Sequence, residues 1–289
     1  AECEHACQAI AALKMVVSKH CLVLTDATPT LEIHARGLLQ LKHEALCSYV
    51  LICPDSLEAL VIDPVLPLAG RIANIIQGHG LQLKAVLDTH LHQDHQSARS
   101  ELLTLLGNPC AGNGCDVLGW PEHSTEIQLG PYQLTRLATP GHTPEAVSIL
   151  LYKQQQLLCA FTGDVILPGG VGRTDLPGGD ISALANSIRL LAGKVGQHTL
   201  LLSSHDYAQR FFTSLALAAT EQPLIQALLN NKPAAKWQPQ LQQQAVTLQQ
   251  ASSYFCGLVE VSLSDATDVI APEQLAAFLQ QWPHMQVVD

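Results

Sequence analysis

Short apolar runs separated by turn-forming residues fill the middle of the chain. A first group of predicted strands covers residues 48–53 (SYVLIC), 59–62 and 83–87. A second group covers residues 125–129, 133–138, 146–152, 157–162 and 199–203. Short runs of this kind, bounded by Gly, Pro, Asp or Ser, are typical of strands.

Apolar positions at helical spacing predict helices among these strands, at residues 69–80, 97–106, 181–191 and 211–219. Helices therefore accompany each group of strands. This order predicts two sheets covered by helices rather than a single parallel sheet. The expected fold class is an α/β sandwich.

The two ends of the chain differ from this pattern. Residues 1–30 are assigned to a leader of unknown role, with a helix expected at 5–17 and a strand at 21–25. Residues 31–250 are assigned to the main domain, and its Gln-rich last part is expected to be a peripheral helix or linker. Residues 251–289 are assigned to a linker and the start of a further unit.

Composition excludes several classes of protein. Of the 289 residues, 47% are hydrophobic and 14% are charged, whereas a disordered chain needs the opposite balance. No run of about 18 uninterrupted apolar residues occurs, so no membrane-spanning segment is expected. The formal net charge of −10 and the lack of a basic run argue against nucleic acid as a partner.

Cysteine and histidine usage adds two expectations. The nine cysteines are odd in number and scattered, so no disulfide framework and a reduced, cytoplasmic compartment are predicted. Cys110 and Cys115 flank a glycine-rich loop, where free thiols are expected and a local disulfide is the alternative. Thirteen histidines against 15 Lys and Arg residues is a high proportion and indicates that some of them are metal ligands.

The segment 88–95 (DTHLHQDH) follows an apolar predicted strand and carries the densest group of candidate ligands. His90 and His92 are two residues apart, so an extended loop directs both side chains to the same side. Asp94 and His95 lie at the entrance to the next predicted helix. Imidazoles and carboxylates held in this way suit zinc, iron or manganese.

Three further motifs each place one candidate ligand just after an apolar strand. They are TPGHTP at 139–144, FTGD at 161–164 and SSHDY at 203–207, and they contribute His142, Asp164 and His205. One such histidine alone would be weak evidence for a metal site. The ordered series HxHxDH, H, D, H indicates a single metal site.

This ordered series resembles the metallo-β-lactamase superfamily over about residues 38–223, and VIDP at 61–64 is similar to the same superfamily. The resemblance implies a four-layered αββα sandwich with the metal site at one edge of its two sheets. It does not fix the reaction, because the superfamily includes hydrolases, oxidoreductases and nucleases.

Three stretches indicate which branch of the superfamily the chain resembles. GRTDLPGGD at 172–180 is similar to the glyoxalase II-like branch, and HDY at 205–207 is similar to the persulfide (sulfur) dioxygenases. Residues 268–289 resemble the opening of a rhodanese domain that stops before its cysteine loop. Persulfide dioxygenases are often fused to rhodaneses, so this truncated start favours sulfur chemistry by association.

The resemblance to persulfide dioxygenases implies one Fe(II) per chain, bound by His90, His142 and Asp164. The implied reaction oxidises a low-molecular-weight thiol persulfide, such as glutathione persulfide, with O₂ to sulfite and free thiol. Arg173 and Asp175 are candidate substrate contacts, although a loop-bracing ion pair is the preferred interpretation. A homodimer and coupling to a sulfurtransferase are left open. Tyr207 would offer its hydroxyl to the metal-bound species. The residues that would orient ligands or move protons are His92, Asp94, His95 and His205.

The alternative is a glyoxalase II-like thioester hydrolase with two Zn(II) ions, whose bridging water would be the nucleophile. One ion would take three histidines, the other would take three further ligands, and one carboxylate would bridge them. All of these ligands are present: His90, His92 and His142; Asp94, His95 and His205; and Asp164. Ligand identity therefore does not separate one metal from two. A binding module without activity is disfavoured by the intact series.

Two positions depart from the persulfide dioxygenase pattern. Glu145 follows GHTP, where these enzymes commonly have Gly, and places a carboxylate near the mouth of the site. It is expected to repel an anionic thiol or to select another carrier, so the identity of the thiol stays open. Leu91 stands where these enzymes often have Cys.

Overall fold

The computed structural model describes residues 22–23, 38–53, 55–91, 94–107, 114–208 and 212–230. Within the leader, only the strand Leu22–Val23 is described. Residues 231–289, which include the rhodanese-like stretch, lie outside the described residues. The assignments of residues 1–30, 31–250 and 251–289 therefore stay predictions.

The first sheet contains five strands in the order β1-β2-β3-β4-β5. Strands β2, β3 and β4 pair antiparallel, whereas β1 with β2 and β4 with β5 pair parallel. Along β3, Tyr49 and Leu51 face the second sheet, and Val50 and Ile52 face the helices. Both faces are buried, which explains an unbroken apolar run in a strand. The strands are β1 (Leu22–Val23), β2 (Leu38–His43), β3 (Leu46–Cys53), β4 (Glu58–Ile62) and β5 (Gln82–Leu87).

The second sheet contains five strands in the order β10-β9-β8-β7-β6. Strands β6 to β9 form an antiparallel series, and β10 pairs parallel to β9. Each of these strands overlaps a strand predicted from the sequence. The strands are β6 (Glu126–Leu129), β7 (Tyr132–Ala138), β8 (Val147–Lys153), β9 (Gln156–Gly163) and β10 (Leu200–Ser203).

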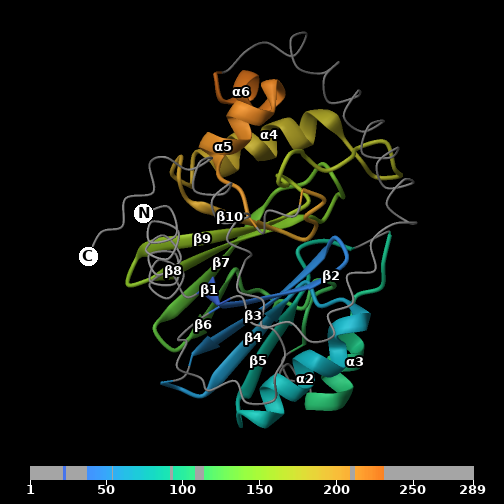
Figure 1. Cartoon of the computed structure of the whole chain (residues 1–289), viewed down its shortest axis with the longest axis vertical. Coiled ribbons are helices and arrows are strands. Elements are labelled where there is room, and N and C mark those ends of the chain that lie inside the picture. The colour runs from blue at the N-terminus through green and yellow to red at the C-terminus, as the bar shows by residue number, and fades with distance from the viewer. Residues whose placement is uncertain are drawn as a thin grey trace, which may run out of the picture.

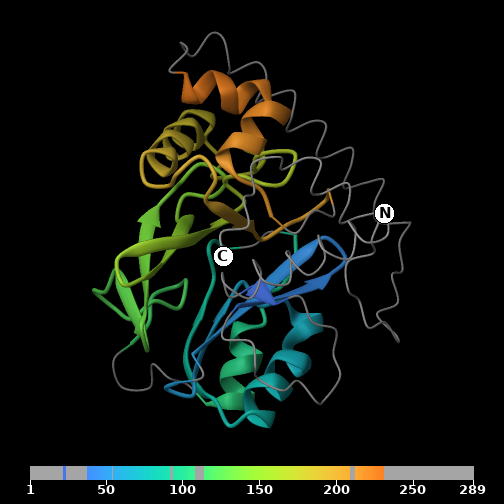
Figure 2. The same cartoon turned by 60° about the vertical axis from the view of Figure 1, so that its left-hand side comes forward.

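Helices cover the outer face of each sheet, so the fold is the expected αββα sandwich (Figures 1 and 2). A 3₁₀ turn, η1 (Leu66–Leu68), leads into α2 (Ala69–Gly78), and α2 packs with α3 (Arg99–Leu106) on the first sheet. The second sheet is covered by α4 (Ile181–Ala192), α5 (Leu215–Glu221) and α6 (Pro223–Leu229).

One helix starts later than its sequence predicts. The apolar pattern places a helix at 211–219, but α5 begins at Leu215. Thr213 instead pairs with Leu201 through two main-chain hydrogen bonds. The Ser214 hydroxyl then caps the helix by accepting from the N–H of Leu217. A local bond to the sheet and an N-cap therefore set the start of the helix.

The two sheets are joined by more than apolar packing. The rings of Tyr49 and Phe161 pack edge to face across the central layer, with 5.0 Å between their centroids. The Tyr49 hydroxyl donates to the main-chain oxygen of Ser203, at 2.7 Å. Lys42 on β2 forms an ion pair of 2.7 Å with Asp206, beyond the end of β10. The loop after β10 is therefore anchored to the first sheet.

The disulfide bonding of the cysteines differs in part from what the sequence predicted. Cys115 is disulfide-bonded, so the expectation of a free thiol is wrong there, because spacing alone does not reveal how closely two cysteines approach. Cys110 lies outside the described residues. Cys47 and Cys53 are free and buried, and Cys159 is also a buried cysteine.

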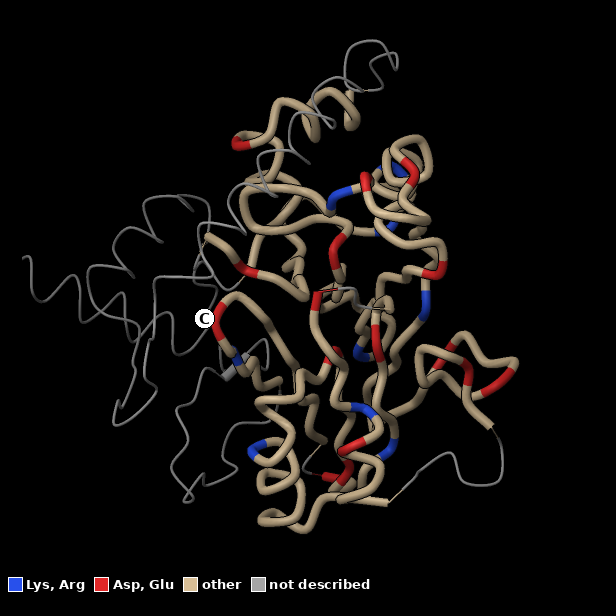
Figure 3. The backbone as a smooth tube through the Cα atoms, turned by 90° about the vertical axis from the view of Figure 1, so that its right-hand side faces the viewer, with Lys and Arg blue, Asp and Glu red and all other residues tan. Residues whose placement is uncertain are grey.

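The described part of the chain offers neither a membrane span nor a concentrated basic surface. None of its helices combines the length and the apolar character that crossing a bilayer requires. Lys and Arg are spread thinly along the tube, with Asp and Glu between them (Figure 3).

Candidate metal centre

The candidate ligands lie on loops that follow strand ends. The segment 88–95 follows β5, residues 139–146 join β7 to β8, Asp164 follows β9, and residues 204–207 follow β10. Main-chain hydrogen bonds connect these loops, from the N–H of Val147 to the oxygen of Thr89 and from the N–H of Ser204 to the oxygen of Gly163. Loops from both sheets therefore meet at one place.

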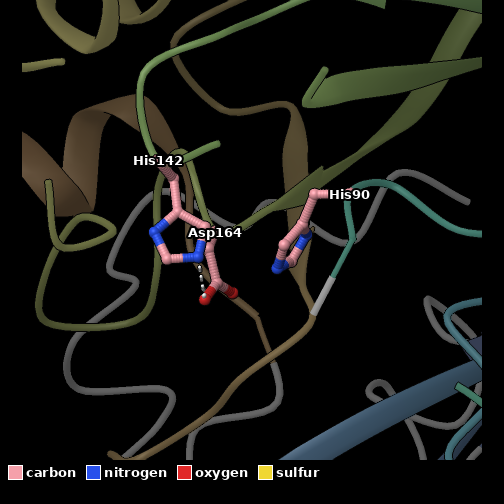
Figure 4. Close-up of side chains that lie close together, drawn as sticks. All are labelled: His90, His142 and Asp164. Carbon is pink, nitrogen blue, oxygen red and sulfur yellow. Dashed lines mark ion pairs between the residues drawn. The ribbon is translucent and has the colours of Figure 1, made fainter. Parts of the chain in front are cut away.

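Three predicted ligands form a compact group. His90, His142 and Asp164 each offer one ligand atom, and these atoms all lie within 4.8 Å of one another. His142 Nε2 is 3.5 Å from Asp164 Oδ2, and the two imidazole rings lie edge to face with centroids 5.0 Å apart (Figure 4). His90 and Asp164 are buried, and His142 is half-buried. Two imidazoles and one carboxylate match the donor set of non-haem Fe(II) sites.

The main chain orients one of these imidazoles. His142 Nδ1 lies 2.8 Å from the main-chain oxygen of Arg173, which can only accept a hydrogen bond. Nδ1 therefore carries the proton, and Nε2 is left to bind a metal. A second hydrogen bond of this kind commonly fixes the tautomer of a ligating histidine.

A second group of candidate ligands lies beside the first. Asp94, His95 and His205 also place one ligand atom each within 4.8 Å of one another. His205 joins the two groups, because its Nδ1 is 2.8 Å from Asp164 Oδ1 and its Nε2 is 2.9 Å from Asp94 Oδ2. Asp94 Oδ1 is 2.9 Å from His95 Nδ1. His92 lies outside the described residues.

The carboxylates and imidazoles in these groups shift one another's pKa values toward the charged forms. Burial lowers the pKa of His205, but the carboxylates of Asp164 and Asp94 outweigh it and raise this pKa to about 10. Burial raises the pKa of Asp164, but His205, His90 and His142 hold it well below its usual range. The pKa of Asp94 is likewise lowered by His205 and His95 against its own burial. Both carboxylates are therefore ionised at neutral pH, as metal binding requires.

Tyr207 lies against this centre. Its ring stacks on the imidazole of His205, with centroids 5.3 Å apart and planes 9° from parallel. Burial, with the negative charges of Asp164 and Asp94, raises the pKa of Tyr207 well above its usual range. The phenol therefore stays protonated and can donate a hydrogen bond. Tyr207 also lines a cavity of about 180 Å³ together with residues 167–170 and Ala208.

Arg173 and Asp175 form a bidentate ion pair. Arg173 Nε is 2.8 Å from Asp175 Oδ1, and Arg173 Nη2 is 2.7 Å from Asp175 Oδ2. This pair raises the pKa of Arg173 and lowers that of Asp175. The same Arg173 supplies the main-chain oxygen that accepts from His142. The pair therefore stiffens the segment that orients a candidate metal ligand.

The centre opens into a cavity of about 510 Å³. Leu91, 47% exposed, lies at this opening and gives it an apolar edge. The lining comes from the loop after β5 and comprises Asp88, His90, Leu91, Asp94, His95, Gln96 and Ser97.

Glu145 holds two ligand-bearing loops together, a role that the sequence did not predict. Its Oε1 accepts hydrogen bonds from the main-chain N–H of Leu91, at 2.8 Å, and from the Thr143 hydroxyl, at 2.7 Å. The carboxylate thus ties the loop that carries His90 to the loop that carries His142. A carboxylate among ligand motifs indicates in general that it holds a neighbouring loop. Here the carboxylate of Glu145 does so by accepting from a main-chain N–H, which the sequence does not identify.

Replacing Glu145 with alanine is expected to weaken metal affinity by about 10-fold, because the Leu91 N–H beside His90 loses its acceptor. Competition between the protein and a chromophoric chelator for Zn(II) measures this change. Glu145→Gln keeps an acceptor oxygen at the same position and serves as the matched control. Equal affinity in the alanine variant and the natural protein would contradict the tethering role.

Similar proteins place the chain in a known superfamily. No family model matches it. The mitochondrial persulfide dioxygenase ETHE1 of Homo sapiens is 34% identical over 165 residues, which cover 55% of this chain and 63% of that protein. The probable metallo-hydrolase YqgX of Bacillus subtilis is 33% identical over 186 residues, which cover 55% of this chain and 83% of that protein. The crystal structure of ETHE1 from Myxococcus xanthus is 30% identical with a TM-score of 0.57, and the match covers 74% of this chain and 98% of that one.

The fold, the ligand series and these relatives agree: the chain belongs to the metallo-β-lactamase superfamily. Its homologues include persulfide dioxygenases and metallo-hydrolases. It spans 63% to 65% of the length of the mammalian persulfide dioxygenases that it matches.

Proposed function

We propose that the protein is a non-haem iron persulfide dioxygenase. It oxidises a low-molecular-weight thiol persulfide, such as glutathione persulfide, with O₂ to sulfite and free thiol. The observation that carries this proposal is the match to the ETHE1 structure from Myxococcus xanthus, which spans 98% of that chain at 30% identity. Mammalian ETHE1 proteins at 34% and 35% identity support the same activity.

The donor set fits one Fe(II) per chain. His90, His142 and Asp164 supply two imidazoles and a carboxylate from three loops, and such a triad leaves coordination positions open. When bound, Fe(II) supplies the redox chemistry with O₂ that amino-acid side chains lack. The protein contributes the positions and protonation states of its own groups around that ion.

The neighbouring side chains have separate roles in this proposal. His205 positions Asp164 through its Nδ1 and holds Asp94 through its Nε2. The protonated phenol of Tyr207, stacked on His205, donates a hydrogen bond to a bound anionic sulfur or oxygen. His95 and Asp94 complete a hydrogen-bonded chain that can move a proton between the centre and the open cavity. His92 is assigned the same proton-moving role.

We assign Arg173 and Asp175 to bracing rather than to direct substrate contact, because each side chain already satisfies the other. Asp175→Ala is then expected to weaken metal affinity and lower kcat while leaving KM nearly unchanged. Steady-state O₂ uptake at varied persulfide concentration separates the two parameters. A rise in KM with kcat unchanged would instead identify the pair as a substrate contact.

One observation favours a second function, a thioester hydrolase with two Zn(II) ions. Asp94, His95 and His205 form a second ligand group next to the first, and one relative is named a probable metallo-hydrolase. Two metals sharing a bridging carboxylate would lower the pKa of a bound water and turn it into a nucleophile. Asp164 lies between the two groups, as that arrangement needs.

The metal content of anaerobically purified protein, combined with O₂ uptake, tests the proposal. About one iron per chain and O₂ uptake that depends on glutathione persulfide are expected. Two zinc ions per chain, thioester cleavage and no O₂ uptake would establish the hydrolase instead. Full metal loading without either activity would favour a binding module.

The cytoplasmic location, a homodimer and coupling to a sulfurtransferase stay predictions from the sequence. The mammalian relatives are mitochondrial by name. The disulfide at Cys115 also departs from the reduced thiols on which the cytoplasmic prediction depends.

A further inference from the structure

A buried carboxylate lies behind the metal centre. Asp63 directly follows β4 and is 1% exposed. It accepts the main-chain N–H of Thr89 at 2.6 Å and the hydroxyl of Ser204 at 2.7 Å. It also lies 2.9 Å and 3.0 Å, through its two oxygens, from the Thr89 hydroxyl. The carboxylate is thus surrounded by donors from the loops that carry His90 and His205.

The hydroxyl of Thr89 stands between this carboxylate and His90. Its Oγ1 is 2.9 Å from Asp63 Oδ2 and 3.0 Å from His90 Nδ1. A hydroxyl has one proton to donate, and an ionised carboxylate can only accept. The proton of Thr89 therefore points to Asp63, and its oxygen accepts the Nδ1 proton of His90.

We propose that Asp63 and Thr89 are positioning residues of the metal centre. Through the Thr89 hydroxyl, the Asp63 carboxylate fixes which nitrogen of His90 carries the proton, and it fixes the orientation of the ring. His90 then presents an unprotonated Nε2 toward His142 and Asp164. This inference rests on the metal site of the proposed function, but it does not depend on the reaction that the metal performs.

The surrounding backbone leaves little freedom to this chain of hydrogen bonds. The main-chain oxygen of Thr89 accepts from the N–H of Val147, at 2.8 Å. A Cβ on Gly163 would lie 2.6 Å from Thr89 Oγ1 and 3.3 Å from His90 Nδ1. The missing side chain at Gly163 therefore provides the space in which the Thr89 hydroxyl meets the imidazole.

The two histidine ligands are oriented by different means. His142 uses a main-chain oxygen, which no substitution removes. His90 uses the Thr89 hydroxyl, which one substitution removes. Loss of such an outer partner typically costs 10- to 100-fold in metal affinity, about 1.4 to 2.7 kcal/mol.

Three variants of the full chain test the proposal. Thr89→Val keeps the shape of the side chain and removes the hydroxyl. Thr89→Ser keeps the hydroxyl. Ser48→Ala removes another buried hydroxyl, which donates to the main-chain oxygen of Asp63 at 2.8 Å and makes no hydrogen bond to Thr89 or His90, so it is the control for loss of one buried bond. The probe is Zn(II) alone, with affinity measured by chelator competition and the His90 Nδ1 proton followed by NMR in the zinc-loaded protein.

Thr89→Val is expected to bind Zn(II) about 10- to 100-fold more weakly and to lose or shift the protected Nδ1 proton signal. Thr89→Ser restores both, and Ser48→Ala stays close to the natural protein. The proposal is overturned if Thr89→Val binds Zn(II) normally, or if Ser48→Ala loses as much affinity as Thr89→Val. These readouts involve no O₂ uptake, so a failure of the dioxygenase proposal is distinguishable from a failure of this one.

Discussion

Replacing His142 with alanine will abolish stoichiometric metal binding and, with it, activity on any substrate. Among the described residues, three side chains form this ligand group, and His142 is one of them, with Nε2 3.5 Å from Asp164 Oδ2. Removing a ligand must cost more than the roughly 10- to 100-fold loss of affinity seen when an outer partner is removed. Elemental analysis of protein loaded anaerobically with Fe(II) measures the loss.

His198→Ala is the matched control, because His198 is an exposed histidine outside both ligand groups. It is expected to keep the full metal content. Retention of about one iron per chain by the His142 variant would show that the ligand group is misassigned. Circular dichroism establishes that both variants are folded before metal is added.

Gly163→Ala will lower the free energy of unfolding by about 2 to 5 kcal/mol. Gly163 has a φ of +51°, and a left-handed conformation costs an ordinary residue about 1 to 2 kcal/mol. The added Cβ would also lie 2.6 Å from Thr89 Oγ1, and overpacking of this kind typically costs about 1 to 3 kcal/mol. Urea denaturation followed by circular dichroism measures the sum.

Gly80→Ala separates the two contributions. Gly80 has a similar φ of +60°, but no atom lies within 4 Å of its Cβ position. Its substitution is therefore expected to cost only the conformational part, about 1 to 2 kcal/mol. Equal losses in the two variants would show that the close approach to Thr89 contributes nothing to stability.

The sequence predicted the elements of the sandwich well, because most strands have both faces buried and stand out as apolar runs. The grouping of the candidate metal ligands was predictable for a related reason: each follows such a run, and the chain repeats this arrangement at His90, His142, Asp164 and His205. Strand β2 (Leu38–His43) was not singled out, since Gln40 and Lys42 interrupt its apolar pattern. In the structure Gln40 donates to Tyr49 and Lys42 pairs with Asp206, so both polar residues have tertiary partners.

The groups that orient the ligands were harder to predict. The partner of His142 is the main-chain oxygen of Arg173, and every residue has such an oxygen. The partner of Glu145 is the N–H of Leu91, 54 residues earlier in the chain. The sequence indicated that Glu145 brings a charge to the site, but its position relative to Leu91 depends on how β5 and β7 are brought together.

The ligands come from both halves of the sandwich, and this has a consequence for folding. His90 follows the first sheet, whereas His142 and Asp164 follow strands of the second. The complete ligand group therefore exists only when the two halves are assembled, and a bound ion would link them. At a metal concentration 100 times Kd, binding to the folded state alone adds about 2.7 kcal/mol to the free energy of unfolding. Neither half on its own can gain that stabilisation, so the stability of the assembled sandwich is expected to rise with metal concentration.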